Sequence, residues 1–430
     1  MLQPRFCRAL VRPHIFLPSS SSSPSSTTSI LFSRPPAPRP APRSIRPFSY
    51  TPRFLRCCSP SSFTVAIPDT PLKMDPSAAA AVNAMKELYP EWLADKTWDN
   101  TGLLLANTES INPNSRPRVL LANDLSPRVV DEAIYYGVSL VIAYHPFIFR
   151  GLKSITLDDP QQVSLIRLAQ NNIAVYSPHT ALDAAPGGIN DWLADSVISA
   201  ARDINSEISG RVTHALKPVS PQQSITAQPG VPRHTDDKGE LITGYGRHVK
   251  LSTPVEIYAL IRGILKHLGL LNDESDTASA ASTLQHVLVA RPRMSQGLGR
   301  EATSEKALFS QPRAGSTDIV QTVAICAGSG ADVIRGSPAD LYLTGEMTHH
   351  DALAATVQGK WVVCLLHSNS ERLFLKQRLQ PQLATVLSKS SPADPISVLV
   401  SEADHDPFEI WDMSGPNAAR ADKRPLTFSI

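Results

Sequence analysis

The sequence predicts an α/β fold, organised as two α/β domains with mainly parallel sheets. From about residue 85 onward, short apolar runs rich in Val, Leu and Ile alternate with amphipathic stretches of helical length. Strands that alternate with helices in this way form βαβ units, so we expect sheets covered by helices on both faces. A chain of 430 residues is also long enough for two domains with cores of their own.

The first predicted domain spans residues 75–205 and has clear signals for its first strand and helix. RVLLAND ends at Asp124 and is a predicted strand. Ser126 then suits the N-cap of a helix, Pro127 its first turn and Gly137 its end. The next elements are a strand in VSLVIAYHP (138–146), a helix in DPQQVSLIRLAQNN (159–172) and a strand in IAVYSPHTALD (173–183) that runs into a loop.

The second predicted domain spans residues 241–394 and follows a polar, Pro-containing linker or insert at 206–240. A second stretch of low order lies at about 291–317, and the segment 395–415 is expected to complete the first domain. The predicted helix STPVEIYALIRGILKHLGL has Ser252 or Thr253 as its cap. Strands are predicted in GYGRHVKL (244–251), QHVLVARP (285–292), VQTVAIC (320–326), ADLYLTGE (339–346) and WVVCLL (361–366), the last followed by a helix.

Residues 1–73 differ in composition from the rest of the chain. They contain nine Arg and one Lys against one acid, Asp69, which gives a formal charge of +9 and leaves −7 for the other residues. An Arg- and Ser-rich, acid-poor leader is typical of a mitochondrial transit peptide, and RPFSYT at 46–51 resembles a matrix-processing site. We therefore expect mitochondrial import with cleavage before Met74, where a second start would give a cytoplasmic form. A disordered tail rich in Pro and Ser is the alternative.

The bulk composition argues against two classes of partner. The mildly basic pI of about 8.2 originates in the leader, so no direct nucleic-acid binding is expected. No run approaches the roughly 18 apolar residues of a membrane-spanning helix, so no membrane partner is expected. Outside the leader only Cys326 and Cys364 remain, and both lie in apolar runs typical of reduced core residues.

A His or a carboxylate follows each of five predicted strands. In open α/β sheets the carboxyl ends of strands form the ligand crevice, so such an accumulation predicts a polar site there. The spacings H-x-x-x-D in HTALD and H-x-x-x-E in HSNSE allow each segment to present two groups to one cavity. These strand-end residues are Asp124, His145, His179 with Asp183, Glu346, and His367 with Glu371.

Imidazole and carboxylate without thiolate suit divalent ions such as Zn, Fe, Mn or Mg. Bridging carboxylates would allow two ions, and a two-metal site can activate water at neutral pH. Alternatives remain open for single motifs. Glu371 could be a favourable acid at a helix N-terminus beside an exposed His367, and His349 and His350 could be solvated.

The turn AGSGAD at 327–332 offers a further site. Glycines between a strand and a helix can leave backbone N–H groups free for phosphate, so Gly328 and Gly330 are candidate nucleotide-binding residues. The third glycine of G-x-G-x-x-G is absent, because Val333 stands there. Tight packing explains the two glycines about as well.

The same segments resemble a known family, the GTP cyclohydrolase 1 type 2 homologues, also called NGG-interacting factor three-like proteins. Six separated motifs occur in the family order and cover roughly residues 85–200, 241–270 and 320–410. They are WDNTGLLL (98–105), YHPFIF (144–149), HTALDAAPGGIND (179–191), GSGADVI (328–334), LTGEMTHHDAL (343–353) and LLHSNSERLFL (365–375).

The resemblance implies two α/β domains that face a shared cavity with a dinuclear metal site, and a homo-oligomer, since bacterial members form hexamers. The implied metal ligands are His145, Asp183, His367 and Glu371, with Asp183 and Glu371 as bridges and His179 beside them. The family usually has two consecutive histidines before the Pro, and here the first is Tyr144. Tyr144 is therefore either a lost ligand or, with His179, a candidate catalytic group.

The family name implies metal-dependent hydrolysis of a purine nucleotide or another small polar substrate. Other members are described as metal-binding proteins or as partners of transcription regulators. The protein therefore has three candidate functions: a metal-dependent hydrolase, an interaction protein with a structural metal site, and a metal-handling protein.

Overall fold

The computed structural model describes residues 72–109, 117–219, 232, 234–271, 287–292, 318–390 and 395–408. All of them belong to one unit, Pro68–Ile430. The predicted transit peptide and most of the two low-order stretches lie outside the described residues. Two larger sheets and a two-stranded ribbon organise the described part, and the prediction of an α/β fold with mainly parallel sheets is confirmed.

The first sheet is largely parallel. Its strand order is β1-β4-β3-β2-β13, and three of its four pairings are parallel, the exception being β1 with β4. β13, from the C-terminal part of the chain, pairs with β2 in register Ser397↔Arg118. The strands are β1 (Gly102–Leu105), β2 (Arg118–Ala122), β3 (Leu140–Ala143), β4 (Ala174–Ser177) and β13 (Ser397–Val400).

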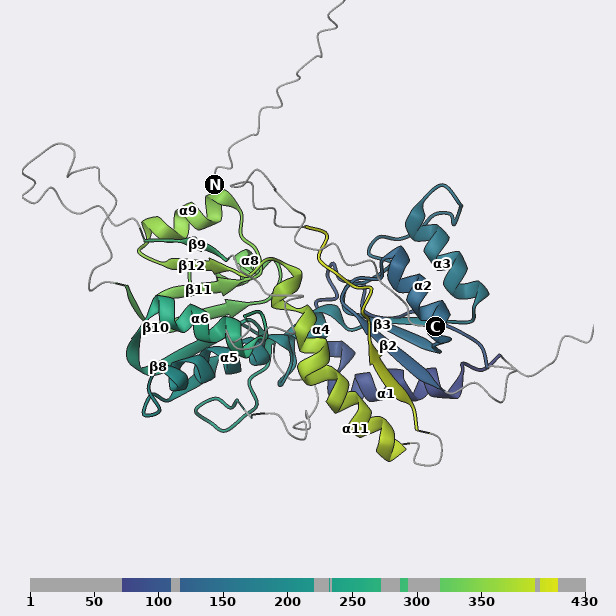
Figure 1. Ribbon diagram of the computed structural model, residues 1–430, viewed down its shortest axis with the longest axis horizontal. Coiled ribbons are helices and arrows are strands. Elements are labelled where there is room, and N and C mark those ends of the chain that lie inside the picture. Colours follow the sequence, from purple (N-terminus) through teal and green to yellow (C-terminus); the bar gives the residue numbers. More distant parts are fainter. Residues whose placement is uncertain are drawn as a thin grey trace, which may run out of the picture. The chain divides into compact units, whose positions relative to one another are not determined.

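Helices cover both faces of this sheet, as Figure 1 shows for α1 on one side and α2 with α3 on the other. Successive residues of β2 alternate between the two apolar layers: Val119 packs in the layer with α1 and Leu120 in the layer with α2 and α3. The predicted caps of α2 are confirmed, since the Ser126 side chain accepts from Val129 N and Gly137 is left-handed. The helices are α1 (Pro76–Leu88), α2 (Pro127–Tyr136), α3 (Pro160–Gln170) and α11 (Gln380–Ser390).

The second sheet is mixed, with strand order β5-β8-β10-β11-β12-β9 and parallel pairing for β10-β11 and β11-β12. Helices α5 and α6 pack on one face and α8 and α9 on the other (Figure 1). The strands are β5 (Gly210–His214), β8 (Arg247–Glu256), β9 (Leu288–Ala290), β10 (Ile319–Cys326), β11 (Leu341–Thr344) and β12 (Trp361–Cys364), and β6 (Lys217–Pro218) pairs with β7 (Gly244–Tyr245). The helices are α5 (Ile189–Ile204), α6 (Ile257–His267), α8 (Ala331–Ile334) and α9 (His349–Val357).

Three local predictions were wrong. The helix expected from Ser252 begins at Ile257, because residues before it extend β8 against β10 and Glu256 supplies the cap by accepting from Tyr258 N and Ala259 N. The stretch 206–240 was expected to be a linker or insert of low order, but it contains β5 and β6, which pair with β8 and β7. HTALD forms a short helix, α4 (His179–Ala184), where a loop was expected.

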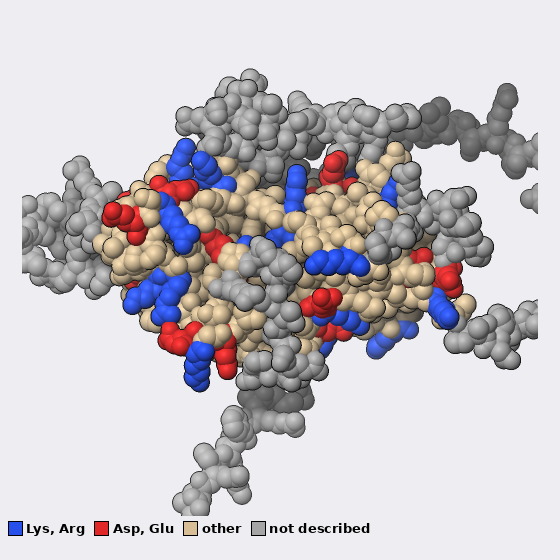
Figure 2. Space-filling model, turned by 90° about the horizontal axis from the view of Figure 1, so that it is seen from below, with Lys and Arg blue, Asp and Glu red and all other residues tan. Residues whose placement is uncertain are grey.

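The charged side chains on the face in Figure 2 are interspersed, with Lys and Arg next to Asp and Glu over the part not covered by grey atoms. This part of the face has no extended patch of one sign. In the described ranges no helix is long and apolar enough to cross a membrane.

Candidate metal site

His145, His367 and Glu371 come together at the carboxyl ends of β3 and β12. One ligand atom from each lies within 4.8 Å of the others, a spacing that could hold a metal ion. The two imidazole Nε2 atoms are 3.4 Å apart. Glu371 places Oε1 3.3 Å from Nε2 of His367 and Oε2 3.5 Å from Nε2 of His145.

Backbone pairing fixes both histidines just beyond their strands. Tyr144 N donates to Ala122 O and His145 N to Asn123 O, so the ladder with β2 continues past β3. After β12, Leu366 has a φ of +70° and turns the chain into a short 3-10 helix, Ser368–Ser370. That single turn brings Glu371 back over His367, which explains the four-residue spacing in the sequence.

A carboxylate holds Nδ1 of each of the three histidines in this region. The distances are 2.8 Å for His145 to Asp124, 3.0 Å for His367 to Glu346 and 2.7 Å for His179 to Asp99. Such a partner fixes the tautomer with the proton on Nδ1 and leaves Nε2 as the basic nitrogen. For His145 and His367, Nε2 is the atom that faces Glu371.

Among the cluster residues, Glu371 argues most strongly for a bound cation, because it is only 2% exposed. Burial raises its pKa well above the usual range, the charges of Asp183 and Asp124 raise it further, and a 3.1 Å hydrogen bond from Asn123 Nδ2 offsets part of the effect. A buried carboxylate between two imidazole nitrogens needs a positive charge to stay ionised. The donor set therefore fits a divalent cation.

Asp183 adjoins this cluster but does not belong to the three-residue group. The Tyr144 hydroxyl donates to Asp183 Oδ1 at 2.6 Å. Burial raises the pKa of Tyr144 well above its usual range, and the charges of Asp183 and Glu371 add to this, so the phenol stays protonated. Burial also raises the pKa of Asp183. Tyr144 thus acts on Asp183 as a hydrogen-bond donor.

His179 lies beside these groups at the start of α4. Its ring centroid is 5.5 Å from those of Tyr144 and His145. Burial alone would raise the pKa of Asp99, but the hydrogen bond and charge of His179, together with Thr180, lower it. Asp99 is therefore an anionic partner that stabilises a proton on Nδ1 of His179.

The glycine turn packs directly against the cluster. A Cβ on Gly328 would lie 2.6 Å from Glu371 Oε1 and 3.2 Å from His367 Nε2. Gly328 N donates to Ser370 Oγ at 2.9 Å and Gly330 N to Thr344 Oγ1 at 3.1 Å. These bonds favour the tight-packing interpretation of the two glycines, and their nucleotide-binding role stays a prediction.

Asn190 connects the turn to Asp183. Its side chain accepts from Ala327 N and donates to Asp183 O, both at 3.0 Å. Next to it, buried Asp191 pairs with buried Arg247, which also donates to the carbonyls of Gly244, Gly246 and Ala185. The backbone around Asp183 is therefore held from several directions.

Sequence reasoning missed several supporting side chains. Asp99 lay inside the WDNTGLLL motif without an assigned role, and Asn123 directly precedes Asp124. Asp404, from the segment after β13, accepts from Asn123 N at 2.6 Å and pairs with Arg372 Nε at 3.3 Å. No spacing in the sequence links these residues, since 281 positions separate Asn123 from Asp404.

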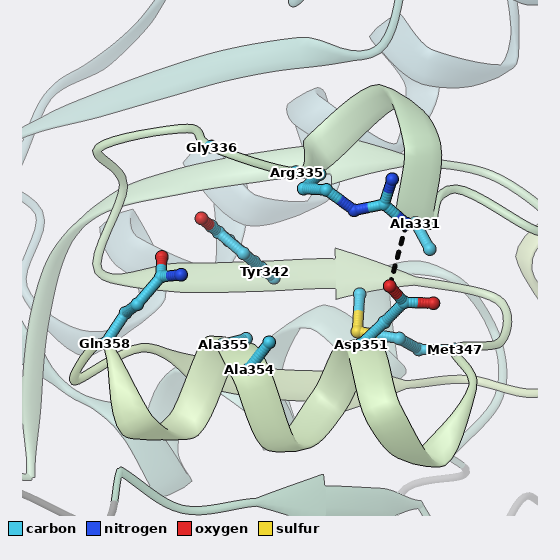
Figure 3. A pocket seen from close by; sticks show the side chains of 9 residues that line it. All are labelled: Ala331, Arg335, Gly336, Tyr342, Met347, Asp351, Ala354, Ala355 and Gln358. Carbon is cyan, nitrogen blue, oxygen red and sulfur yellow. Dashed lines mark hydrogen bonds and ion pairs between the residues drawn. The ribbon is translucent and has the colours of Figure 1, made fainter. Parts of the chain in front are cut away.

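A hollow of about 100 Å³ lies apart from the cluster, between α8, β11 and α9 (Figure 3). Arg335 and Asp351 form an ion pair of 2.8 Å at its edge, and Tyr342, Met347 and Gln358 line it. None of the three cluster residues lines this hollow. The exposed His349 and His350 at the start of α9 are not part of the cluster.

The fold and the cluster define an α/β protein with a His–Glu site that could hold a metal ion at the ends of strands from two sheets. The chain belongs to the Duf34/NIF3 (NGG1p interacting factor 3) family, whose model matches residues 77–290 and 299–407. The family resemblance of the sequence motifs is thereby confirmed.

Similar proteins agree with this membership. The chain is 37% identical over 326 residues to the protein NIF3 homolog of Schizosaccharomyces pombe, covering 75% of this chain and 94% of the relative. It is 32% identical to NIF3-like protein 1 of Homo sapiens, with 73% and 88% covered, and to NGG1-interacting factor 3 of Saccharomyces cerevisiae, with 74% and 95% covered.

Two solved structures share the fold. A Bacillus cereus protein related to NIF3 gives a TM-score of 0.52 at 20% identity, and a hypothetical protein of Staphylococcus aureus gives 0.51 at 22%. In both comparisons, 79% of this chain and 100% of the other are covered.

Proposed function

We propose that this protein binds two divalent ions, Zn, Fe or Mn, and hydrolyses a small polar substrate, with purine nucleotides as the first candidates. The observation that carries the proposal is the buried Glu371 carboxylate placed between two Nε2 atoms whose Nδ1 sides are held by Asp124 and Glu346. Asp183 would complete the ligand set beside them. Bound ions would supply Lewis-acid activation of water and of a substrate oxygen.

The protein side chains would handle the protons. His179, with Asp99 on its Nδ1, has Nε2 as its basic nitrogen and suits a general base. Tyr144 is protonated and donates to Asp183, so its hydroxyl orients that carboxylate; in the alternative role it would give this proton to substrate only after leaving Asp183. Burial around Tyr144 and Glu371 keeps water from weakening these contacts.

The ligand set can be tested by elemental analysis. Purified protein should contain about one to two divalent ions per chain, and the double variant Asp183→Asn, Glu371→Gln should lose them. Asp332→Asn is the matched control, because the Asp332 side chain is 79% exposed on α8 and pairs with Arg335 instead of with the cluster. Unchanged metal content in the double variant would refute the proposed metal site.

Activity needs a separate measurement. Metal-reconstituted protein incubated with GTP should release formate or another hydrolysis product. If a panel of nucleotides and small amides stays intact under several metals, a non-enzymatic interaction protein becomes the better proposal. The name of the Saccharomyces cerevisiae relative, NGG1-interacting factor 3, supports that second candidate, with a transcription regulator as partner.

Localisation and assembly are further parts of the proposal. The Arg-rich leader supports mitochondrial import. N-terminal sequencing of protein from purified mitochondria tests this, because recovery of an intact Met1 would refute cleavage.

A homo-oligomer, with six subunits as the family resemblance implies, is tested by sedimentation of the purified protein.

A further inference from the structure

We propose that the exposed rings of Trp98 and Phe149 form a stacking subsite for a planar heteroaromatic ring, beside the candidate metal site. This inference rests on the proposed function and specifies the class of substrate. The two rings have centroids 6.0 Å apart and are tilted by 51° to one another. Trp98 also meets His179 edge to face, with centroids 5.7 Å apart at 88°.

Both rings are exposed although they are large and apolar. Trp98 is 53% exposed and Phe149 is 49% exposed. Leaving such rings in water forgoes the free energy that burying each of them would contribute. Paired exposed aromatic rings next to a polar cluster are typical of a ligand-contacting surface, where one face is apolar and the adjoining groups fix orientation.

The backbone turn that carries Trp98 is held by residues that also contact His179. Asp95 N donates to Thr180 Oγ1 at 3.1 Å and Asp99 N to Asp95 O at 3.0 Å. The Asp99 side chain then contacts both His179 and Thr180. The turn carrying Trp98 is thus fastened to α4, the helix that also carries Asp183.

Phe149 is positioned by a link between its own segment and the turn. Asn100 Nδ2 donates to Ile148 O, so the chain next to Phe149 is tied to the chain next to Trp98. Since both segments are fastened before a ligand arrives, little conformational entropy would be lost on binding.

A continuous series of rings leads from this pair to the metal cluster. Trp98 contacts His179, whose centroid lies 5.5 Å from that of His145, and His145 lies 5.3 Å from His367. A planar ring bound at Trp98 and Phe149 would therefore lie beside His179, the ring of this series nearest to Trp98. Stacking selects for a flat π-face, so this pair favours a planar ring over a sugar or a phosphate group.

The test compares two probes that differ only by a base. Adenosine 5′-monophosphate and ribose 5-phosphate share a phosphorylated sugar, and only the first has a planar ring. Binding to metal-loaded protein is measured by calorimetry and by quenching of tryptophan fluorescence. The variants are Trp98→Leu and Phe149→Leu, and Tyr258→Leu is the control, because Tyr258 is 70% exposed on α6.

We expect the wild type to bind adenosine 5′-monophosphate about 10-fold or more tightly than ribose 5-phosphate. Trp98→Leu and Phe149→Leu should remove most of this preference, whereas Tyr258→Leu should retain it. Equal affinity for the two probes, or no binding of the nucleotide at millimolar concentration, would overturn the subsite. A change of oligomeric state in Trp98→Leu would overturn it as well, because the rings would then be a contact between copies of the chain.

Metal content is measured on the same samples and separates this inference from the proposed function. If the wild-type protein contains metal but binds adenosine 5′-monophosphate no more tightly than ribose 5-phosphate, the stacking subsite is refuted and the metal site is not. Absence of metal refutes the metal site, and the binding preference can still be measured on that protein.

Discussion

Tyr144 stands where the family resemblance implies the first of two consecutive histidines. Its hydroxyl donates to Asp183, and burial together with the charges of Asp183 and Glu371 raises its pKa, so the phenol is protonated near neutral pH when no cation is bound. A neutral imidazole binds Zn readily. We therefore propose that Tyr144 is a lost ligand, which would leave the second ion of the proposed site with fewer protein donors than the first.

Tyr144→His should raise the occupancy of the second, weaker zinc site, as titration of apo protein followed by calorimetry would show. Tyr144→Phe is the matched control, since it removes the hydroxyl without adding a ligand. Two equal, tight sites in the wild type would contradict the interpretation. Unchanged occupancy with reduced turnover in Tyr144→His would instead assign the phenol to catalysis.

Asp340 allows a pH-dependent test away from the site. Its Oδ2 accepts from Gln321 N, Thr322 N and Thr322 Oγ1 at 2.8–2.9 Å. Burial raises its pKa, but these hydrogen bonds outweigh burial and lower the pKa below the usual range of an Asp carboxyl. A carboxyl with a lowered folded-state pKa stabilises the fold above its unfolded pKa, and the contribution is lost as pH falls through the folded value.

Asp340→Asn should therefore lower the free energy of unfolding by about 1–2 kcal/mol at pH 7. The difference from wild type should shrink as pH falls below about 4, where the wild-type carboxyl becomes protonated. Denaturant unfolding at several pH values measures this. Asp332→Asn serves as the exposed control, and a difference that does not depend on pH would contradict the argument.

At the scale of elements, the turn between β10 and α8 connects folding to the site. Gly328 has a φ of +59°, and its missing side chain leaves room for Glu371 and His367. Gly336, near the end of α8, has a φ of +82° with nothing within 4 Å of an added Cβ. Both glycines thus have a left-handed backbone conformation. They differ in that an added Cβ would clash at Gly328 and would lie in open space at Gly336.

Gly336→Ala should cost about 1–2 kcal/mol, the strain of a left-handed residue, and should leave metal content unchanged. Gly328→Ala should cost more, because the added methyl must displace a buried carboxylate, and it should also reduce bound metal. Denaturant unfolding and elemental analysis of both variants give the comparison. Equal effects of the two substitutions would show that contact with Glu371 is unimportant.

The periodicity of the sequence predicted most elements because each depends on local side-chain patterns. Ser126 and Gly137 marked α2 correctly, and their signals are local. The start of α6 was wrong, because pairing of β8 with β10 overrides the local capping signal of Ser252 and Thr253. β5 was missed for the same reason: its strand character comes from its partner, β8.

At the scale of the whole molecule, the C-terminal segment joins parts of the chain that are distant in sequence. β13 adds an edge strand to the first sheet, and the residues after it contact the site. Asp404 binds Asn123 and Arg372, Asp406 accepts from Ser368, and Glu402 N donates to Glu132. The segment is therefore positioned to stabilise the loop that carries His367 and Glu371.

Truncation after Val400 should lower the melting temperature by several degrees and weaken metal binding about 10-fold or more, because ligand orientation depends on these outer contacts. Truncation after Phe408 is the control that retains them. Thermal unfolding and metal titration of both truncated proteins measure the effect. Wild-type behaviour of the shorter protein would show that the segment does not support the site.

The sequence by itself determined the α/β class, the strand ends that carry His145, His367 and Glu371, and the family. These features depend on local periodicity and on motif order. The tertiary structure decided which groups meet: the carboxylate partners of each Nδ1, the Tyr144 contact with Asp183, and the packing of Gly328 on Glu371. His145 and His367 are 222 positions apart, and only the packing of two sheets fixes a distance across that separation.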